Sequence, residues 1–254
     1  MSELRLENQG RVAHLLIDRL EKRNAFTQAM WETLPGLVES AMADPNVRVL
    51  IMRAAEPGAF SAGADIGEFS TGARDSDWRR KNQAAIRKAM AAVADAPKPV
   101  LAQIEGDCIG GGCGLALACD FRIATPSARF GITPAKLGLV YSLHDTKLLV
   151  DLVGPSAAKR ILYTAELIDG PRALAIGLVD ELADHPGEAA ADLSAAICAV
   201  SSHTVRASKA MVKRILHGQS EDDADTLAQF AVAFDGPDFA EGVDAFLNKR
   251  KPSF

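Results

Sequence analysis

Two short segments rich in glycine and alanine carry the strongest chemical signal in the sequence. The first is Phe60-Ser61-Ala62-Gly63-Ala64-Asp65-Ile66, and the second is Gly110-Gly111-Gly112-Cys113-Gly114. Small side chains let the backbone approach a ligand closely, and glycine adopts dihedral angles that other residues avoid. A glycine-rich entry to a helix also leaves backbone N–H groups without partners. Such donors suit a phosphate group or the negative charge that develops on a carbonyl oxygen during a reaction.

Taken singly, each turn also fits a plain packing role, because glycine often serves only to let two backbones approach. The spacing of the glycines does not match the G-x-G-x-x-G pattern of dinucleotide-binding folds or the GxxxxGK[ST] pattern of a P-loop. The sequence also lacks a GxSxG nucleophile elbow. Nucleotide binding and serine hydrolase chemistry therefore lose support.

The elements that must position these turns alternate between strand and helix. The residues before position 18 predict a β-hairpin, and Thr27 is the expected N-cap of a helix that runs to Asp44 and contains Pro35. Buried strands are predicted at 47–54, 100–104 and 121–124, with helices at 78–93 and 111–118. This order predicts an α/β fold with mostly parallel strand pairing.

Helical patterns dominate after about residue 142. The predicted helices span residues 142–153, 155–164, 171–176, 187–201, 205–217, 222–234 and 237–249. We therefore expect a core domain at residues 1–195 and a C-terminal helical region at 196–254. The last helices carry more apolar residues than a free surface helix needs, which predicts packing against another subunit.

Composition excludes several classes of protein. The chain has 254 residues, 48% of them apolar, and a net charge of −5, which argues against nucleic-acid binding. Its four cysteines show no CxxC spacing, so we expect reduced thiols and no metal site. No apolar run approaches the length of a membrane span, and residues 1–12 lack the apolar core of a signal peptide. These features predict a cytoplasmic protein without a membrane partner.

The two turns, in this order and with their surroundings, resemble those of the crotonase (enoyl-CoA hydratase/isomerase) superfamily. The resemblance spans nearly the whole chain and rests on these segments: Arg19–Phe26, Phe60–Ile66, Lys98–Val100, Gly110–Gly112, Leu115–Asp120, Phe130-Gly131, Leu137–Leu139, Gly154-Pro155, Ala173–Val179 and Ala245–Pro252.

The resemblance implies a crotonase-like ββα spiral core, a helical C-terminal trimerisation region, and a homo-oligomer that is a trimer or a dimer of trimers. It implies an oxyanion hole formed by the N–H groups of Ala64 and Gly111, which would stabilise the enolate of an acyl-CoA thioester. Coenzyme A would be held by Lys22, Arg23, Ala62, Asp65 and Ile66, and Phe246 and Lys249 would close over it from the same or a neighbouring subunit. No cofactor beyond the coenzyme A of the substrate is implied.

The chain departs from the hydratases of this family at the two positions that move protons. Hydratases have glutamates there, whereas this chain has Gly114 and Pro134, neither of which can carry a proton. Gly114 is expected to leave room for a bulkier acyl group. Thr133-Pro134 and Tyr141 also resemble methylmalonyl-CoA decarboxylases. That match is incomplete, because those enzymes have a histidine in place of Ala64 and keep a glutamate in place of Gly114.

Tyr141, His144 and Asp145 are the candidate replacements for the missing acid and base. Tyr141 could donate a proton or be a core phenol with a satisfied hydroxyl. His144 and Asp145 could pair as an acid–base couple or could cap the helix that starts near Ser142. Asp65 is expected to be a structural hydrogen-bond acceptor as well as part of the coenzyme A site.

Three functions remain open from the sequence. The first is an enzyme of the enoyl-CoA hydratase/isomerase family, a lyase or isomerase that stabilises a thioester enolate. The second is a decarboxylase of the methylmalonyl-CoA type or an acyl-CoA hydrolase. The third is a non-catalytic acyl-CoA-binding protein. The sequence favours the first as a family assignment and leaves the reaction undefined.

Overall fold

A central six-stranded sheet organises the computed structural model, which describes residues 3–254. The strand order is β1-β2-β3-β4-β6-β9, and all neighbours are parallel except β1 and β2, which form an antiparallel hairpin. Its strands are β1 (Leu4–Gln9), β2 (Val12–Ile17), β3 (Val49–Ala54), β4 (Val100–Ile104), β6 (Phe121–Ala124) and β9 (Glu181–Leu182). The predicted α/β fold with mostly parallel pairing is confirmed.

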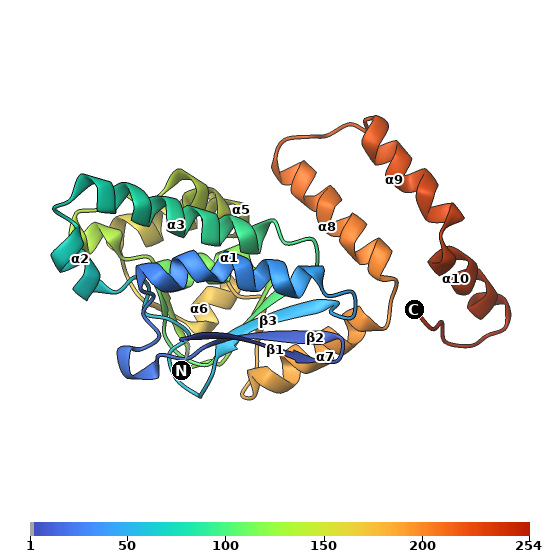
Figure 1. Ribbon diagram of the computed structural model, residues 1–254, viewed down its shortest axis with the longest axis horizontal. Helices are drawn as coiled ribbons and strands as arrows, with labels where there is room; N and C mark the ends of the chain where they lie inside the picture. Colours follow the sequence, from blue (N-terminus) through green and yellow to red (C-terminus); the bar gives the residue numbers. More distant parts are fainter. Residues whose placement is uncertain (1–2) are drawn as a thin grey trace.

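Helices cover both faces of this sheet and bury it (Figure 1). One face packs against α1 (Gln28–Ala43), α3 (Ser76–Ala94), α4 (Gly111–Ala118) and α5 (Leu143–Thr164), which enclose the larger apolar core. The other face carries a smaller cluster, where Ile51 and Leu101 meet Ala190 of α7 (Pro186–Cys198). Burial on both faces explains why the central strands read as continuous apolar runs.

A second, small sheet holds the glycine-rich turn at the start of α4. It consists of β5 (Cys108–Ile109), β7 (Arg129–Gly131) and β8 (Ile168–Asp169), in the order β5-β7-β8. The remaining elements are η1 (Leu20–Lys22), α2 (Ile66–Gly72), η2 (Pro134–Leu137) and α6 (Gly170–Ala175). The strands of the small sheet have two or three residues each, too few for a periodic signal, and the sequence did not reveal them.

The predicted helices and strands of the core are confirmed with small changes at their ends. Thr27 accepts a hydrogen bond from the Met30 N–H and so caps α1, and the helix continues through Pro35. The first strand after α1 begins at Val49 rather than Val47. The helices predicted at 142–153 and 155–164 form one element, α5, with a kink where Gly154 adopts a φ of 72°.

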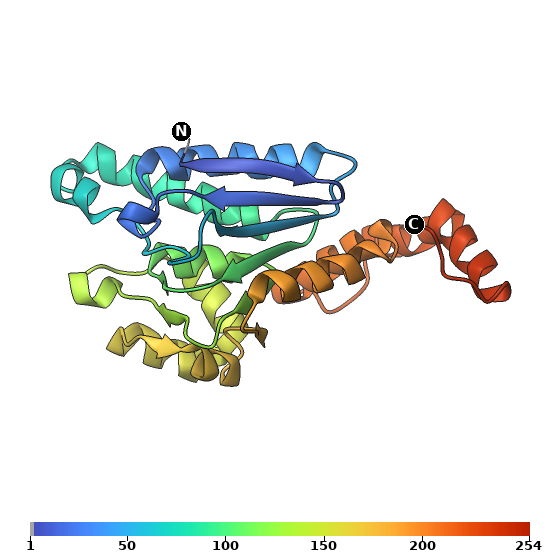
Figure 2. The same cartoon turned by 90° about the horizontal axis from the view of Figure 1, so that it is seen from below.

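The C-terminal helices extend away from the core as an arm (Figures 1 and 2). The arm consists of α8 (Ser202–Leu216), α9 (Ala224–Asp235) and α10 (Pro237–Leu247). Large apolar side chains are exposed along α9 and α10: Leu227, Phe230, Val232, Phe234, Phe239, Val243, Phe246 and Leu247. Within residues 3–254 no helix is long and apolar enough to cross a membrane.

A buried cation fixes the C-terminal end of α4 to the sheet. The Arg122 side chain is 1% exposed and donates to the carbonyl oxygens of Cys119 and Leu178 at 2.7 and 2.9 Å. It also forms an ion pair of 2.6 Å with Asp180. Carbonyl oxygens at the end of a helix lack partners within the helix, so a cation placed there stabilises them.

Replacing Arg122 with methionine should therefore destabilise the fold. Arg122→Met leaves these buried acceptors unpaired, and we expect the free energy of unfolding to fall by about 3 kcal/mol in chemical denaturation at fixed protein concentration. Arg80→Met is the control, because the Arg80 side chain is 74% exposed, and it should change the value by less than about 0.5 kcal/mol. Equal effects of the two substitutions would contradict a structural role for Arg122.

Candidate active site

The two glycine-rich turns lie directly against each other. Ser61 and Cys108 form a parallel β-bridge, in which the Ile109 N–H donates to the Ser61 carbonyl at 2.9 Å and the Ser61 N–H donates to the Asp107 carbonyl at 3.1 Å. A second bridge joins Phe26 to Ala64. The first turn is therefore held between the segment after η1 and the strand that leads into α4.

Glycine is required where these backbones meet. Gly63 has a φ of 94°, and a Cβ atom there would lie 2.9 Å from the Gly111 nitrogen. A Cβ on Gly112 would lie 2.4 Å from the Ser61 carbonyl oxygen. Both distances are shorter than carbon makes with nitrogen or oxygen without a bond, so these positions need glycine for space.

The backbone N–H groups of Ala64 and Gly111 meet at this junction, and neither has a hydrogen-bond partner within residues 3–254. Several neighbouring amides are used: Gly63 donates to the Ser61 hydroxyl, Asp65 to the Phe26 carbonyl, and Gly110 to the Gly131 carbonyl. The Ala64 nitrogen lies 3.6 Å from the position that a Cβ of Gly111 would take. The two free donors are thus close together, and one of them opens α4, where the helix dipole is positive.

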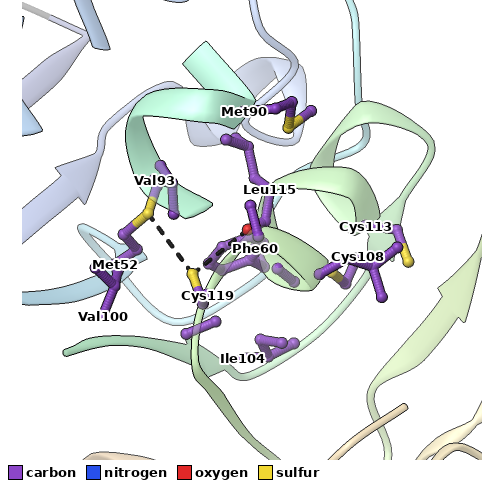
Figure 3. Packing of buried hydrophobic residues seen from close by; sticks show 14 of the residues in the cluster. Met52, Phe60, Met90, Val93, Val100, Ile104, Cys108, Cys113, Leu115 and Cys119 are labelled. Carbon is purple, nitrogen blue, oxygen red and sulfur yellow. Dashed lines mark hydrogen bonds between the residues drawn. The ribbon is translucent and has the colours of Figure 1, made fainter. Parts of the chain in front are cut away.

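Tyr141 and Met90 fill the space beside Gly114. A Cβ atom on Gly114 would lie 2.9 Å from the Tyr141 hydroxyl oxygen and 2.9 Å from Met90 Cε. Figure 3 shows Met90 and Leu115 packed toward each other, and Cys108 beside Cys113. The expectation that Gly114 leaves room for a bulkier acyl group is therefore wrong, because side chains from α3 and from the segment before α5 take that volume. Pro134 begins η2 and brings no titratable group.

His144 and Asp145 form a hydrogen-bonded pair at the start of α5. His144 Nδ1 lies 3.0 Å from Asp145 Oδ1, and Asp145 is only 5% exposed. The cap of this helix is the Ser142 hydroxyl, which accepts from the Asp145 N–H at 3.0 Å. His144 and Asp145 are therefore paired, as an acid–base couple would need. Asp145 also lies in the first turn of α5, where its charge suits the helix dipole, but the side-chain cap of the helix is Ser142.

Tyr141 is not a core phenol with a satisfied hydroxyl. Its oxygen is buried and has no hydrogen-bond partner among the described residues. Burial, with the charge of Asp145, raises the pKa of the Tyr141 phenol well above its ordinary value. The group is therefore a neutral donor throughout the physiological range.

A cluster of charges lies beside the first turn. Arg23 follows η1 with a φ of 54°, accepts a hydrogen bond from the Ala62 N–H, and forms an ion pair with Asp107. Arg129 holds the same carboxylate through two bonds of 2.7 and 2.8 Å. These bonds, with the charge of Arg23, keep the pKa of Asp107 below its ordinary value. The sequence did not single out Asp107 and Arg129, because only the fold brings them to Arg23.

The acidic residues of the first turn hold the backbone. The Asp65 carboxylate accepts from Arg19 and from the Gly67 N–H, both at 2.7 Å, and so caps α2. The Glu68 carboxylate accepts from the Gln28 N–H at 2.7 Å, at the start of α1. The structural role expected for Asp65 is confirmed, and Glu68 likewise serves as a helix-capping acceptor. Ile66, the next residue after Asp65, is exposed at the surface.

Phe246 and Lys249 lie far from the two turns within one chain. Phe246 is 82% exposed on α10, and Lys249 follows this helix with a φ of 53°. In both views α10 is at one end of the molecule and α2 is at the other (Figures 1 and 2). Lys22 of η1 is exposed on the core side with Arg23. Within one chain, Arg23 and Asp65 lie at the first turn and Tyr141 lies beside Gly114 of the second, whereas α10, which carries Phe246, lies at the other end of the molecule.

Two further features lie outside this junction. A cavity of about 770 Å³ lies between the helices of the arm, and the residues that line it include Arg48, His203 and Phe246. It contains none of the residues around Ala64 and Gly111. Across residues 3–254 no group of three or more His, Cys, Asp or Glu side chains is arranged to hold a metal ion.

Known proteins resemble this chain over its whole length. Residues 7–254 match the family model described as enoyl-CoA hydratase/isomerase. A crotonyl-CoA hydratase from Syntrophomonas wolfei is 34% identical, covering 98% of this chain and 96% of the relative. Mouse mitochondrial methylglutaconyl-CoA hydratase is 30% identical over 100% of this chain and 85% of its own. A crystal structure of an enoyl-CoA hydratase/isomerase family protein from Hyphomonas neptunium superposes with a TM-score of 0.97 at 39% identity, covering 100% and 97% of the two chains.

The Arg19–Asp65 contact predicts a pH-dependent contribution to stability. Hydrogen bonding to Arg19 holds the pKa of Asp65 below its ordinary value. This stabilisation is present above the unfolded-state pKa of about 3.9 and is lost as the pH falls through the lower pKa of the folded state. Asp65→Asn should reduce the free energy of unfolding by about 1 kcal/mol at pH 7, and the difference from the parent should shrink below about pH 3.

Asp75→Asn is the matched control for this measurement. Asp75 caps α3 through the Asp77 N–H, as Asp65 caps α2, but it has no ion pair among the described residues. Chemical denaturation is measured at pH 7 and below about pH 3. At pH 7 we expect Asp65→Asn to lose stability and Asp75→Asn to keep it. A loss of equal size at both pH values would mean that the carboxylate charge of Asp65 contributes nothing.

Proposed function

Since the chain belongs to the enoyl-CoA hydratase/isomerase family, we propose that it polarises the thioester carbonyl of an acyl-CoA with the backbone N–H groups of Ala64 and Gly111. The observation that carries this proposal is that the N–H groups of Ala64 and Gly111 are free and lie close together where the two turns meet. Fixed donors aimed at one oxygen stabilise the negative charge of an enolate, and each is worth about 3 kcal/mol of barrier.

The proton-moving half of the site differs from that of a two-glutamate hydratase. Gly114 and Pro134 cannot exchange protons. The Tyr141 hydroxyl lies beside Gly114, and the His144–Asp145 pair lies at the start of α5. The Tyr141 hydroxyl oxygen lies 2.9 Å from the point where the Cβ atom of a side chain at position 114 would be. We assign Tyr141 the role of a neutral donor to the acyl group, and Asp145, oriented by His144, the role of acid–base group.

Coenzyme A would lie along the first turn. Lys22 and Arg23 are exposed beside Ala62 and can approach its phosphates, and Arg129, which shares Asp107 with Arg23, adds a third cation. The Asp65 carboxylate is engaged with Arg19, so it contributes by holding the turn in place, and Ile66 offers an apolar surface next to it. No cofactor other than the coenzyme A of the substrate is needed for this chemistry.

The arm supports a homo-oligomer, which we propose to be a trimer or a dimer of trimers. The apolar side chains exposed on α9 and α10 form a larger contiguous set than a monomer in water normally presents. Phe246 and Lys249 are too far from the first turn of their own chain to close over coenzyme A, so another subunit would supply them. We also keep the cytoplasmic location as a proposal, since all four cysteines are free thiols.

A panel of acyl-CoA esters assayed for product by mass spectrometry tests this function. Enoyl-type, malonyl-type and saturated esters separate hydration and isomerisation from decarboxylation and thioester hydrolysis. We expect turnover of at least one ester, and crotonyl-CoA hydration well below roughly 10 per second, because both glutamates are missing. Fast crotonyl-CoA hydration would show that this account of Gly114 and Pro134 is wrong.

Gly111→Ala links that turnover to the free N–H groups. The added Cβ would lie 3.1 Å from the Trp31 ring and 3.6 Å from the Ala64 nitrogen, in the space of the bound oxygen. We expect a loss of activity of about 100-fold or more. Gly36→Ala is the matched control, because a Cβ there meets nothing within 4 Å. Full activity of Gly111→Ala would contradict the proposed oxyanion hole.

A further inference from the structure

Two buried donors without partners lie against one face of α4. The Tyr141 hydroxyl is one, 2.9 Å from the position of a Cβ on Gly114. The other is the Trp31 indole N–H, whose ring atom Cζ2 lies 3.1 Å from the position of a Cβ on Gly111. Residues 111 and 114 are three apart on a helix and share a face. The Tyr141 hydroxyl and the Trp31 ring thus both lie against the first turn of α4.

A buried donor without a partner costs about 1–3 kcal/mol, so two of them in one place require an explanation. Neither can be a metal ligand or a nucleophile in its present state, because an indole N–H only donates and the pKa of the Tyr141 phenol is raised. What both lack is an acceptor. An acceptor carried by the ligand would remove the cost when it binds.

The charges around Tyr141 decide the kind of acceptor. Burial, and after it the charge of the Asp145 carboxylate, raises the pKa of the Tyr141 phenol. The Cys108 thiol is neutral, because burial raises its pKa as well. Asp145 is buried, and its described side-chain partner is His144. A second carboxylate placed on the Tyr141 hydroxyl would be repelled by Asp145 in a site of low dielectric constant. A neutral carbonyl or hydroxyl oxygen meets no such penalty.

We propose that Tyr141, seated against Gly114 and assisted by Trp31, is the specificity-determining donor for acyl groups that carry an uncharged oxygen acceptor beyond the thioester. The Tyr141 hydroxyl lies where a side chain at position 114 would begin. The site therefore offers the ligand a neutral donor there instead of an ionised carboxylate. The pocket therefore selects oxo- or hydroxyacyl groups over plain alkyl and over carboxylated ones. This inference rests on the proposed acyl-CoA function and names its substrate class.

The test compares the dissociation constants of three coenzyme A esters by calorimetry. Butyryl-CoA has no acyl acceptor, acetoacetyl-CoA has a 3-oxo group, and malonyl-CoA has nearly the same shape as acetoacetyl-CoA with a carboxylate in place of the methyl ketone. For the unaltered protein we expect acetoacetyl-CoA to bind at least about tenfold more tightly than either of the others. A mass spectrum taken after each titration identifies any ester that turns over.

Tyr141→Phe removes only the hydroxyl, and the preference for acetoacetyl-CoA over butyryl-CoA should fall to less than about threefold. Tyr163→Phe is the matched control, because Tyr163 is the other tyrosine of the chain and is 75% exposed on α5. It should keep the tenfold preference. If Tyr141→Phe fails to fold, the three esters on the unaltered protein decide the matter.

The outcomes separate this inference from the function beneath it. Equal affinities for butyryl-CoA and acetoacetyl-CoA, tighter binding of malonyl-CoA, or an unchanged preference in Tyr141→Phe would overturn the inference and leave acyl-CoA binding intact. Binding of none of the three esters would overturn the proposed function and this inference together.

Discussion

The contact between the Ser61 backbone and Gly112 is the constraint on which the site depends. Ser61 is fully buried, and its hydroxyl donates to the Asn24 carbonyl at 2.8 Å and accepts from the Gly63 N–H at 3.1 Å. Its carbonyl lies so close to Gly112 that no side chain fits there. Because backbone meets backbone without side chains between them, two segments about 50 residues apart in sequence position their N–H groups within one small volume.

This arrangement makes the donors that we propose to polarise the thioester carbonyl independent of side-chain chemistry. A substitution other than to proline leaves the backbone N–H group in place, whereas the groups that move protons are side chains and change with the residue. The chain illustrates this difference. It has the junction of the two turns, while position 114 is a glycine, and the Tyr141 hydroxyl and Met90 occupy the space beside it. The same donors can therefore serve a different reaction of the enolate.

Local sequence signals were sufficient for the turns and for most of the fold. Glycine runs, the Thr27 cap and the apolar strands depend on neighbouring residues, so the sequence predicts them well. The sequence did not predict that Tyr141 and Met90 occupy the space beside Gly114. The position of Tyr141 depends on how the chain after η2 returns to α4 through Gly138, which has a φ of 68°. The Asp107–Arg129 pair and the place of Trp31 likewise depend on distant segments meeting in the fold. The position of Phe246 over a ligand would depend on other chains and has no signal in a single sequence.

The carbonyl stretch of a bound thioester tests the central claim most directly. Butyryl-CoA labelled with ¹³C at the thioester carbonyl can be followed by isotope-edited infrared difference spectroscopy, free and bound. Two hydrogen bonds from Ala64 and Gly111 to the oxygen weaken the C=O bond, so the account predicts a clear shift of the band to lower wavenumber on binding. A bound ester whose carbonyl band stays at the position of the free ester would contradict it.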